Sequence, residues 1–141
     1  MLFRSIDASL RQRPTVVVWL FDQSVSLSAQ RKEIAARLER VFQELGADRT
    51  AKHRPDLENL VLAYGKNVSV VTKKPTDDVG EVIGAIESVP VDESGIEMTF
   101  TAIRAAAETA RIFRTSAPRR NVMIVVFTDE VGNDQIGRAH V

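Results

Sequence analysis

The feature that most constrains this 141-residue chain is an unbroken apolar run at residues 15–21, which reads Thr-Val-Val-Val-Trp-Leu-Phe. A short, valine-rich run of this kind is typical of a strand that is buried on both faces of a sheet. The run ends abruptly in Asp22, Ser24 and Ser26, and a helical pattern begins directly afterwards. Because α/β sheets place their sites at the carboxyl ends of strands, the sequence predicts an α/β domain with a polar site after this strand.

The side chains of Asp22, Ser24 and Ser26 offer a carboxylate and two hydroxyls. These are hard oxygen donors, which suit Mg²⁺ or Mn²⁺ better than Zn²⁺. The simpler reading is that Asp and Ser residues before a helix only cap its free N–H groups. The metal interpretation is favoured if a second strand end brings further oxygen ligands to the same edge.

The composition excludes several classes of function. Lysine and arginine together number 19, as do aspartate and glutamate, so no bulk charge favours nucleic acid or an anionic membrane surface. The absence of cysteine rules out disulfides, thiolate metal sites and a cysteine nucleophile. The longest apolar run is too short to cross a bilayer, so no membrane insertion is expected within this segment.

Helical and strand patterns alternate along the rest of the chain. Helices are predicted at residues 3–12, from an N-cap at Ser28 to Gly46, from residue 76 to Pro90 with Asp78 and Glu81 as a capping box, and beyond the polar loop at residues 91–95. The buried side of the last helix is expected to carry Ile103, Ala106, Ala107, Ala110 and Phe113. Two short β runs, at residues 59–64 and 68–72, flank a tight turn and predict an antiparallel hairpin.

A second fully buried strand is predicted at residues 122–127, and it too ends in polar residues, beginning with Thr128 and Asp129. Two buried strands that end in Asp22-x-Ser24-x-Ser26 and in Thr128-Asp129, with a loop and helix between them, resemble the von Willebrand factor A (vWA) domain. The resemblance covers about residues 14–134. It implies a doubly wound, Rossmann-like α/β fold whose sheet is mostly parallel with one antiparallel edge strand. The strand order in this chain would be 3-2-1-4, without the last two strands of such a domain.

The resemblance also implies a function, which is the recognition of a protein partner through a metal-ion-dependent adhesion site. Ser24 and Ser26 would ligate Mg²⁺ (or Mn²⁺), and Asp22 and Asp129 would hold the ion through bound waters. A threonine of the family, in the loop before the third helix, aligns here with Glu97. Thr99 lies two residues further on, and both residues stay candidates for the remaining ligand.

Two other functions are open. A magnesium-dependent phosphotransferase or phosphatase of doubly wound fold would also place an Asp after each of these strands, but such phosphatases usually carry a second Asp where this chain has Ser24. A metal-free scaffold with the same fold is the other alternative. A glycine-rich phosphate loop follows neither strand, which makes a dinucleotide-binding domain unlikely. We therefore expect a binding domain and not an enzyme.

The chain is expected to divide into three parts. Residues 1–13 form an amphipathic lead-in helix, and residues 14–134 form a partial vWA domain. Residues 135–141, Gln-Ile-Gly-Arg-Ala-His-Val, resemble the in-frame translation of a common sequencing adapter that ends in a stop codon. We therefore expect this last part to be a non-native tail.

Overall fold

The structure, a computed structural model, describes residues 2–46 and 54–128. Four strands and five helices alternate along these residues. In chain order they are α1 (Leu2–Gln12), β1 (Thr15–Asp22), α2 (Val25–Ser28), α3 (Arg31–Glu44), β2 (Leu57–Tyr64), β3 (Val68–Val70), α4 (Val79–Glu87), α5 (Thr99–Thr115) and β4 (Asn121–Phe127). His53, Asp129 and the expected tail at 135–141 lie outside the described residues.

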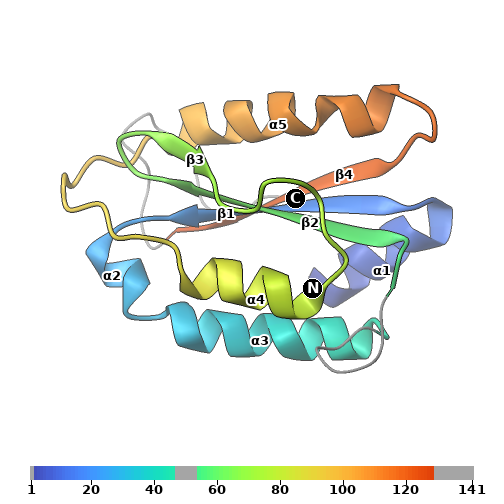
Figure 1. Ribbon diagram of the computed structural model, residues 1–141, viewed down its shortest axis with the longest axis horizontal. Coiled ribbons are helices and arrows are strands. Elements are labelled where there is room, and N and C mark those ends of the chain that lie inside the picture. Colours follow the sequence, from blue (N-terminus) through green and yellow to red (C-terminus); the bar gives the residue numbers. More distant parts are fainter. Residues whose placement is uncertain (1, 47–53, 129–141) are drawn as a thin grey trace.

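The four strands form one sheet in the order β3-β2-β1-β4, which confirms the predicted order. Strand β1 pairs in parallel with β2 on one side and with β4 on the other, and β3 pairs antiparallel with β2. The predicted hairpin is therefore present, and the short β3 forms one edge of the sheet (Figure 1). The chain winds from β1 toward β2 in one direction and reaches β4 in the other, so the switch point lies between β1 and β4.

Helices cover both faces of the sheet. Helices α1, α3 and α4 lie on one face, and α5 lies alone on the other (Figure 1). Side chains of β1 alternate between the two layers: Val17, Trp19 and Phe21 pack toward the three-helix side, and the residues between them pack toward α5. All eight residues of β1 are buried, which explains why its sequence is apolar throughout rather than alternating.

The two layers use side chains of different size. On the three-helix side the Trp19 ring meets Phe42 edge-on, and its indole N–H donates to the Asn59 side chain at 2.9 Å. On the other side α5 presents a stripe of small residues, Ala102, Ala106 and Ala110, which allow the helix to approach the sheet closely. Ala107 was predicted on this stripe but is exposed, because the buried residues recur every four positions and position 107 falls outside that row.

The helix after β1 begins earlier than predicted. Ser24, and not Ser28, is the N-cap, and its side chain accepts a hydrogen bond from the Leu27 N–H. The helix that was predicted as one piece is divided into α2 and α3. Gln30 is the N-cap residue of α3, and its side chain makes no capping hydrogen bond. The predicted end at Gly46 holds, since Gly46 follows α3 with a φ of 86°. Helix α4 is shorter than the predicted span from residue 76 to Pro90, but the Asp78 side chain caps it as predicted, by accepting from the Glu81 N–H. None of the described helices is both long and apolar enough to cross a membrane.

Candidate metal centre

The predicted site residues of the described chain gather at the carboxyl edge of the sheet. Asp22 ends β1 directly opposite Tyr64, the last residue of β2, and Thr128 follows β4 at the same level. Helix α2 and the loop before α5 lie at this end of the molecule (Figure 1). Parallel strands therefore bring three chain segments, far apart in the sequence, to the switch point between β1 and β4.

Asp22 is held at both of its carboxylate oxygens. Oδ1 accepts from the backbone N–H of Ser24 at 2.6 Å, and Oδ2 accepts from the hydroxyl of Thr128 at 2.9 Å. The residue is fully buried. A buried carboxylate with two such bonds has a fixed orientation, and each oxygen keeps a lone pair for another contact.

Ser24 and Ser26 lie beside Asp22, as predicted. Their hydroxyl oxygens are 3.5 Å apart. Adjacent oxygen ligands around Mg²⁺ lie roughly 3 Å apart, since each is about 2.1 Å from the ion in octahedral geometry. A small closing movement would therefore let both hydroxyls contact one ion. Ser24 is also the N-cap of α2, accepting from Leu27 N at 3.2 Å, so the capping reading and the ligand reading both apply to it.

The sequence did not single out Tyr64, which links the strand ends. The Thr99 hydroxyl donates to the Tyr64 hydroxyl at 3.0 Å, and the Thr128 side chain is hydrogen-bonded to the same phenol. Burial raises the pKa of Tyr64 to about 12, and the charges of Asp22 and Glu97 add to this shift, whereas the two threonine bonds oppose it. Thr99 and Asp22 are thus joined through Tyr64 and Thr128 in a continuous polar network.

The loop before α5 is tied to the ends of β1 and β2. The Asp92 N–H donates to the Gln23 carbonyl at 2.8 Å, and the Met98 N–H donates to the Gly65 carbonyl at 3.1 Å. Asp92 also accepts from the N–H groups of Lys66 and Ser94, which lower the pKa of its carboxyl group. A Cβ atom at position 65 would lie 2.2 Å from Asp92 Oδ2, so the close approach of the loop requires glycine there.

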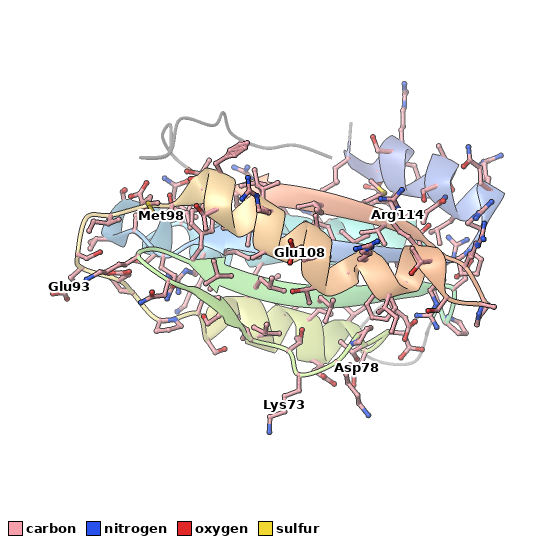
Figure 2. The ribbon with its side chains drawn as sticks, turned by 90° about the horizontal axis from the view of Figure 1, so that it is seen from above. Lys73, Asp78, Glu93, Met98, Glu108 and Arg114 are labelled. Carbon is pink, nitrogen blue, oxygen red and sulfur yellow. The ribbon has the colours of Figure 1, made fainter. Side chains whose placement is uncertain are left out.

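This loop carries both candidates for the remaining ligand, Glu97 and Thr99, into the interior. Glu97 is 4% exposed and Thr99 is fully buried. Glu97 therefore does not point to solvent at the start of α5. Figure 2 shows Glu93 and Met98 at this end of the molecule, where the loop leads into α5. Thr99 belongs to the hydrogen-bonded network through Tyr64, and Glu97 lies close enough for its charge to act on that phenol.

A buried cation, which the sequence analysis missed, lies near Asp22. Arg31, the first residue of α3, is 6% exposed, and its Nε and Nη2 atoms have no hydrogen-bond partner among the described residues. Desolvation lowers the pKa of Arg31, and the charge of Asp22 partly counteracts this effect. An arginine three residues before the apolar stripe that begins at Ile34 gives no sequence signal of burial, because arginine is almost always solvated.

The donor set fits a hard cation. It consists of hydroxyl and carboxylate oxygens, the ligands that Mg²⁺ and Mn²⁺ prefer. Within residues 2–46 and 54–128, no group of three or more His, Cys, Asp or Glu side chains is arranged to hold a metal ion. Among the predicted ligands that the structure describes, Ser24, Ser26 and Thr99 carry hydroxyl groups. The predicted ligand Asp129 lies outside the described residues.

Comparison with known proteins gives a fold but no close relative. No family model and no curated protein sequence matches the chain. The vWF domain of the type V pili tip protein Mfa5 from Porphyromonas gingivalis superposes with a TM-score of 0.61 at 18% identity, over 85% of this chain and 39% of that one. A structure of three N-terminal domains of Mfa5 gives a TM-score of 0.58 at 16% identity, over 85% of this chain.

The chain thus spans well under half the length of these two structures, 39% of one and 20% of the other. At 16–18% identity the likeness concerns the fold. The sheet order, the parallel β1 pairs and the antiparallel β3 agree with that likeness. The chain therefore has the fold of a von Willebrand factor A domain.

Proposed function

We propose that this domain recognises a protein partner through a divalent cation, Mg²⁺ or Mn²⁺, held at the candidate metal centre. The observation that carries the proposal is the position of the Asp22 carboxylate, fixed at both oxygens, next to a pair of serine hydroxyls whose oxygens are 3.5 Å apart. These groups lie at the switch point between β1 and β4, where an open α/β sheet has its binding crevice.

The neutral and the charged residues of the proposed site would have different roles. Neutral hydroxyls of Ser24, Ser26 and Thr99 would contact the ion, and Asp22, with Asp129 and Glu97, would supply the negative charge that retains it. When bound, such an ion supplies an electrophilic centre that accepts an oxygen ligand from the partner. Ser26 is exposed and Ser24 is half-buried, so a partner would approach from the α2 side.

An enzymatic role for Asp22 is less well supported. A phosphotransferase of this fold would need a carboxylate oxygen that faces its substrate. Asp22 is fully buried, and both of its oxygens already accept hydrogen bonds from neighbouring groups. The arrangement suits a carboxylate that orients its surroundings better than one that attacks a phosphoryl group.

The test is a calorimetric titration of the chain with MgCl₂ and MnCl₂. Ser26→Ala removes a proposed ligand that does not cap a helix, and we expect it to weaken metal binding at least about tenfold, the loss of roughly one coordination bond. Ser28→Ala is the matched control, because Ser28 lies in the same helix and its hydroxyl donates to the Val25 carbonyl at 2.6 Å. The control should bind metal like the parent.

Two results would contradict the proposal in different ways. Equal affinities of the parent and Ser26→Ala would show that the ligands are misassigned. No heat and no rise in the melting temperature of the parent at millimolar Mg²⁺ and Mn²⁺ would favour the metal-free scaffold, since an ion bound only by the folded state must stabilise it.

A further inference from the structure

The hydroxyl groups between Thr99 and Asp22 can be given a direction by counting their protons. A threonine or tyrosine hydroxyl carries a single proton, and an ionised carboxylate can only accept. The Thr128 hydroxyl donates its proton to Asp22 Oδ2 at 2.9 Å. While the Tyr64 phenol is neutral, Thr128 must therefore accept in its hydrogen bond with Tyr64, and the phenol is the donor there.

The same count fixes the remaining bond of the network. Because the phenol proton points to Thr128, the Tyr64 oxygen is an acceptor toward Thr99, whose hydroxyl donates to it at 3.0 Å. A negative charge at the end of a buried row of hydrogen bonds polarises and strengthens the bonds in the row. All three protons therefore point the same way, from Thr99 through Tyr64 and Thr128 to Asp22.

This direction decides what the Thr99 oxygen offers to a cation. Thr99 is the first residue of α5, and both Thr99 and Tyr64 are fully buried, so bulk water does not compete for the Thr99 proton. A hydroxyl oxygen binds a cation through a lone pair, and a hydroxyl proton that faces the cation opposes binding. With its proton directed to Tyr64, the Thr99 oxygen presents lone pairs on its other sides.

We infer that Tyr64 is a positioning residue of the candidate metal centre, whose hydroxyl turns the proton of Thr99 away from the ion and so makes Thr99 a ligand. The inference rests on the proposed function, because it concerns the ion of that site. Tyr64 acts on the ion only through Thr99. An ion on the Thr99 oxygen would in turn make that hydroxyl a stronger donor, which couples the ion to Asp22 through the row.

A double-mutant cycle of Tyr64→Phe and Thr99→Val, measured by calorimetric titration with MgCl₂, tests this role. Tyr64→Phe keeps the ring but removes the acceptor of the Thr99 proton, so Mg²⁺ binding should weaken at least about fivefold. Thr99→Val removes the ligand and should weaken binding at least about tenfold. Adding Tyr64→Phe to Thr99→Val should change the affinity by less than about twofold, because the phenol then has no ligand to position.

Two further results bear on the cycle. Thr99→Ser keeps the hydroxyl, so it should bind Mg²⁺ like the parent and should again lose affinity when Tyr64→Phe is added. Losses that multiply independently in the double variant would overturn the proposal, since a tyrosine that only stabilises the fold would lower the affinity with or without the Thr99 hydroxyl.

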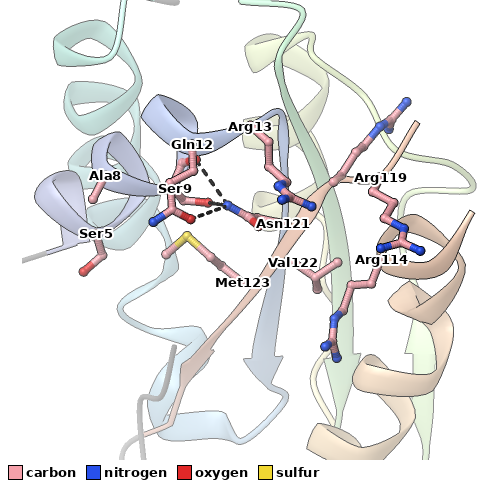
Figure 3. A pocket seen from close by; sticks show the side chains of 11 residues that line it. Ser5, Ala8, Ser9, Gln12, Arg13, Arg114, Arg119, Asn121, Val122 and Met123 are labelled. Carbon is pink, nitrogen blue, oxygen red and sulfur yellow. Dashed lines mark hydrogen bonds between the residues drawn. The ribbon is translucent and has the colours of Figure 1, made fainter. Parts of the chain in front are cut away.

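A polar cluster at the amino edge of the sheet, where β1 and β4 begin, provides the matched control. The Asn121 side chain donates to the Ser9 carbonyl at 3.2 Å and to the Ser9 hydroxyl at 3.0 Å (Figure 3). These residues line a hollow of about 600 Å³ between α1, β4 and α5. Asn121→Ala removes bonds between two elements, as Tyr64→Phe does, but at the opposite end of the strands. Its Mg²⁺ affinity should stay within about twofold of the parent, and a loss equal to that of Tyr64→Phe would overturn the proposal.

The direction of the row can also be measured in the unaltered chain, so the test does not depend on the folding of a variant. In an NMR spectrum recorded without metal, the hydroxyl proton of Thr99 is assigned by its coupling to the Thr99 methyl carbon. It should show a nuclear Overhauser contact with the ring of Tyr64, the one tyrosine of the chain. A Tyr64 hydroxyl proton that contacts the Thr99 methyl group instead would reverse the direction and overturn the proposal.

The experiments separate this inference from the proposed function. If the parent binds no Mg²⁺, the proposed function fails and the role of Tyr64 fails with it. If the parent binds Mg²⁺ and Ser26→Ala weakens the binding, but Tyr64→Phe binds like the parent, the metal site stands and only the positioning role of Tyr64 is wrong.

Discussion

The two ends of the sheet can be compared directly, since both are built from the same strands. At the carboxyl edge the polar side chains are buried and bonded to one another, as in the chain from Thr99 through Tyr64 and Thr128 to Asp22. At the amino edge Arg13, Arg114 and Arg119 are exposed and have no ion pair within the described residues. The formal net charge of zero therefore does not mean an even distribution of charge, since these arginines gather at one edge of the sheet.

The difference between the ends has an energetic meaning. A buried polar network stabilises the fold only while every member keeps its partner, so each member is sensitive to replacement. Exposed, unpaired charges contribute little to folding and are available to ligands. The carboxyl edge is thus pre-organised by the fold, whereas the arginine side chains of the amino edge lie exposed to solvent. The following predictions test this contrast, from the largest expected effect to the smallest.

Replacing one residue at each end of the sheet should lower the free energy of unfolding by very different amounts. Asp22→Ala leaves the Ser24 N–H and the Thr128 hydroxyl without their acceptor, and it removes the negative charge near the buried Arg31. We expect the free energy of unfolding to fall by roughly 3 kcal/mol. Arg119→Ala should change it by less than about 0.5 kcal/mol. Urea unfolding followed by Trp19 fluorescence measures both, and equal losses would remove the contrast between the two ends.

Tyr64 gives the carboxyl edge a pH dependence that can be followed directly, because it is the only tyrosine of the chain. Its pKa is raised from 10.0 to about 12 in the folded protein, so the neutral phenol stabilises the fold. This contribution is complete below pH 10 and is lost as the pH rises through 12. The free energy of unfolding should fall by roughly 2–3 kcal/mol over that range through Tyr64 alone.

Two measurements check this behaviour. Absorbance at the tyrosinate band should show a midpoint near pH 12 in the folded protein and near pH 10 in urea. Tyr64→Phe should lack the corresponding loss of stability, so the difference between parent and variant isolates the contribution of the phenol. A midpoint near pH 10 in the folded protein would mean that the hydrogen-bonded network does not change the pKa of the Tyr64 phenol.

The buried Arg31 should weaken cation binding at the carboxyl edge, and this prediction rests on the proposed metal site. Its positive charge acts on Asp22 from within the protein. Replacing Arg31 with Met keeps much of the side-chain volume and removes two buried N–H-bearing atoms that have no partner. Affinity for Mg²⁺ should rise about fivefold, the equivalent of roughly 1 kcal/mol. Lys32→Met, at an exposed neighbouring position, is the control and should leave the affinity unchanged.

The fold was largely predictable from the sequence, because its main determinants are local patterns. The apolar run of β1 indicated a buried parallel strand, and the turn after Tyr64 indicated the hairpin. The similar run of β4 also forms a parallel strand, but the prediction that it is fully buried is wrong, since four of its seven residues are half-buried. The helix start after β1 was predicted at the wrong serine. Ser24 and Ser28 both suit an N-cap by composition, and only the hydrogen bond to Leu27 N distinguishes them.

The site was predictable only in part, for a related reason. Asp22, Ser24 and Ser26 could be recognised from the sequence, because they are polar residues directly after an apolar strand. Tyr64 did not, because a tyrosine at the end of a strand is common and its role depends on Thr99, which lies 35 positions further along the chain. Arg31 was missed because burial of an arginine is decided by what packs over it in three dimensions, and no local pattern encodes that.

The central position of β1 in the sheet has a consequence for how the chain folds during synthesis. Its two neighbours are β2, which follows after an intervening helix, and β4, which begins only at Asn121. During synthesis the fully buried central strand therefore has one edge open until almost all of the described chain has left the ribosome. Contacts between residues this distant in sequence form slowly, and an unpaired apolar edge is prone to aggregate in the interval. Protection by a chaperone should matter most in the time between the emergence of β2 and that of β4.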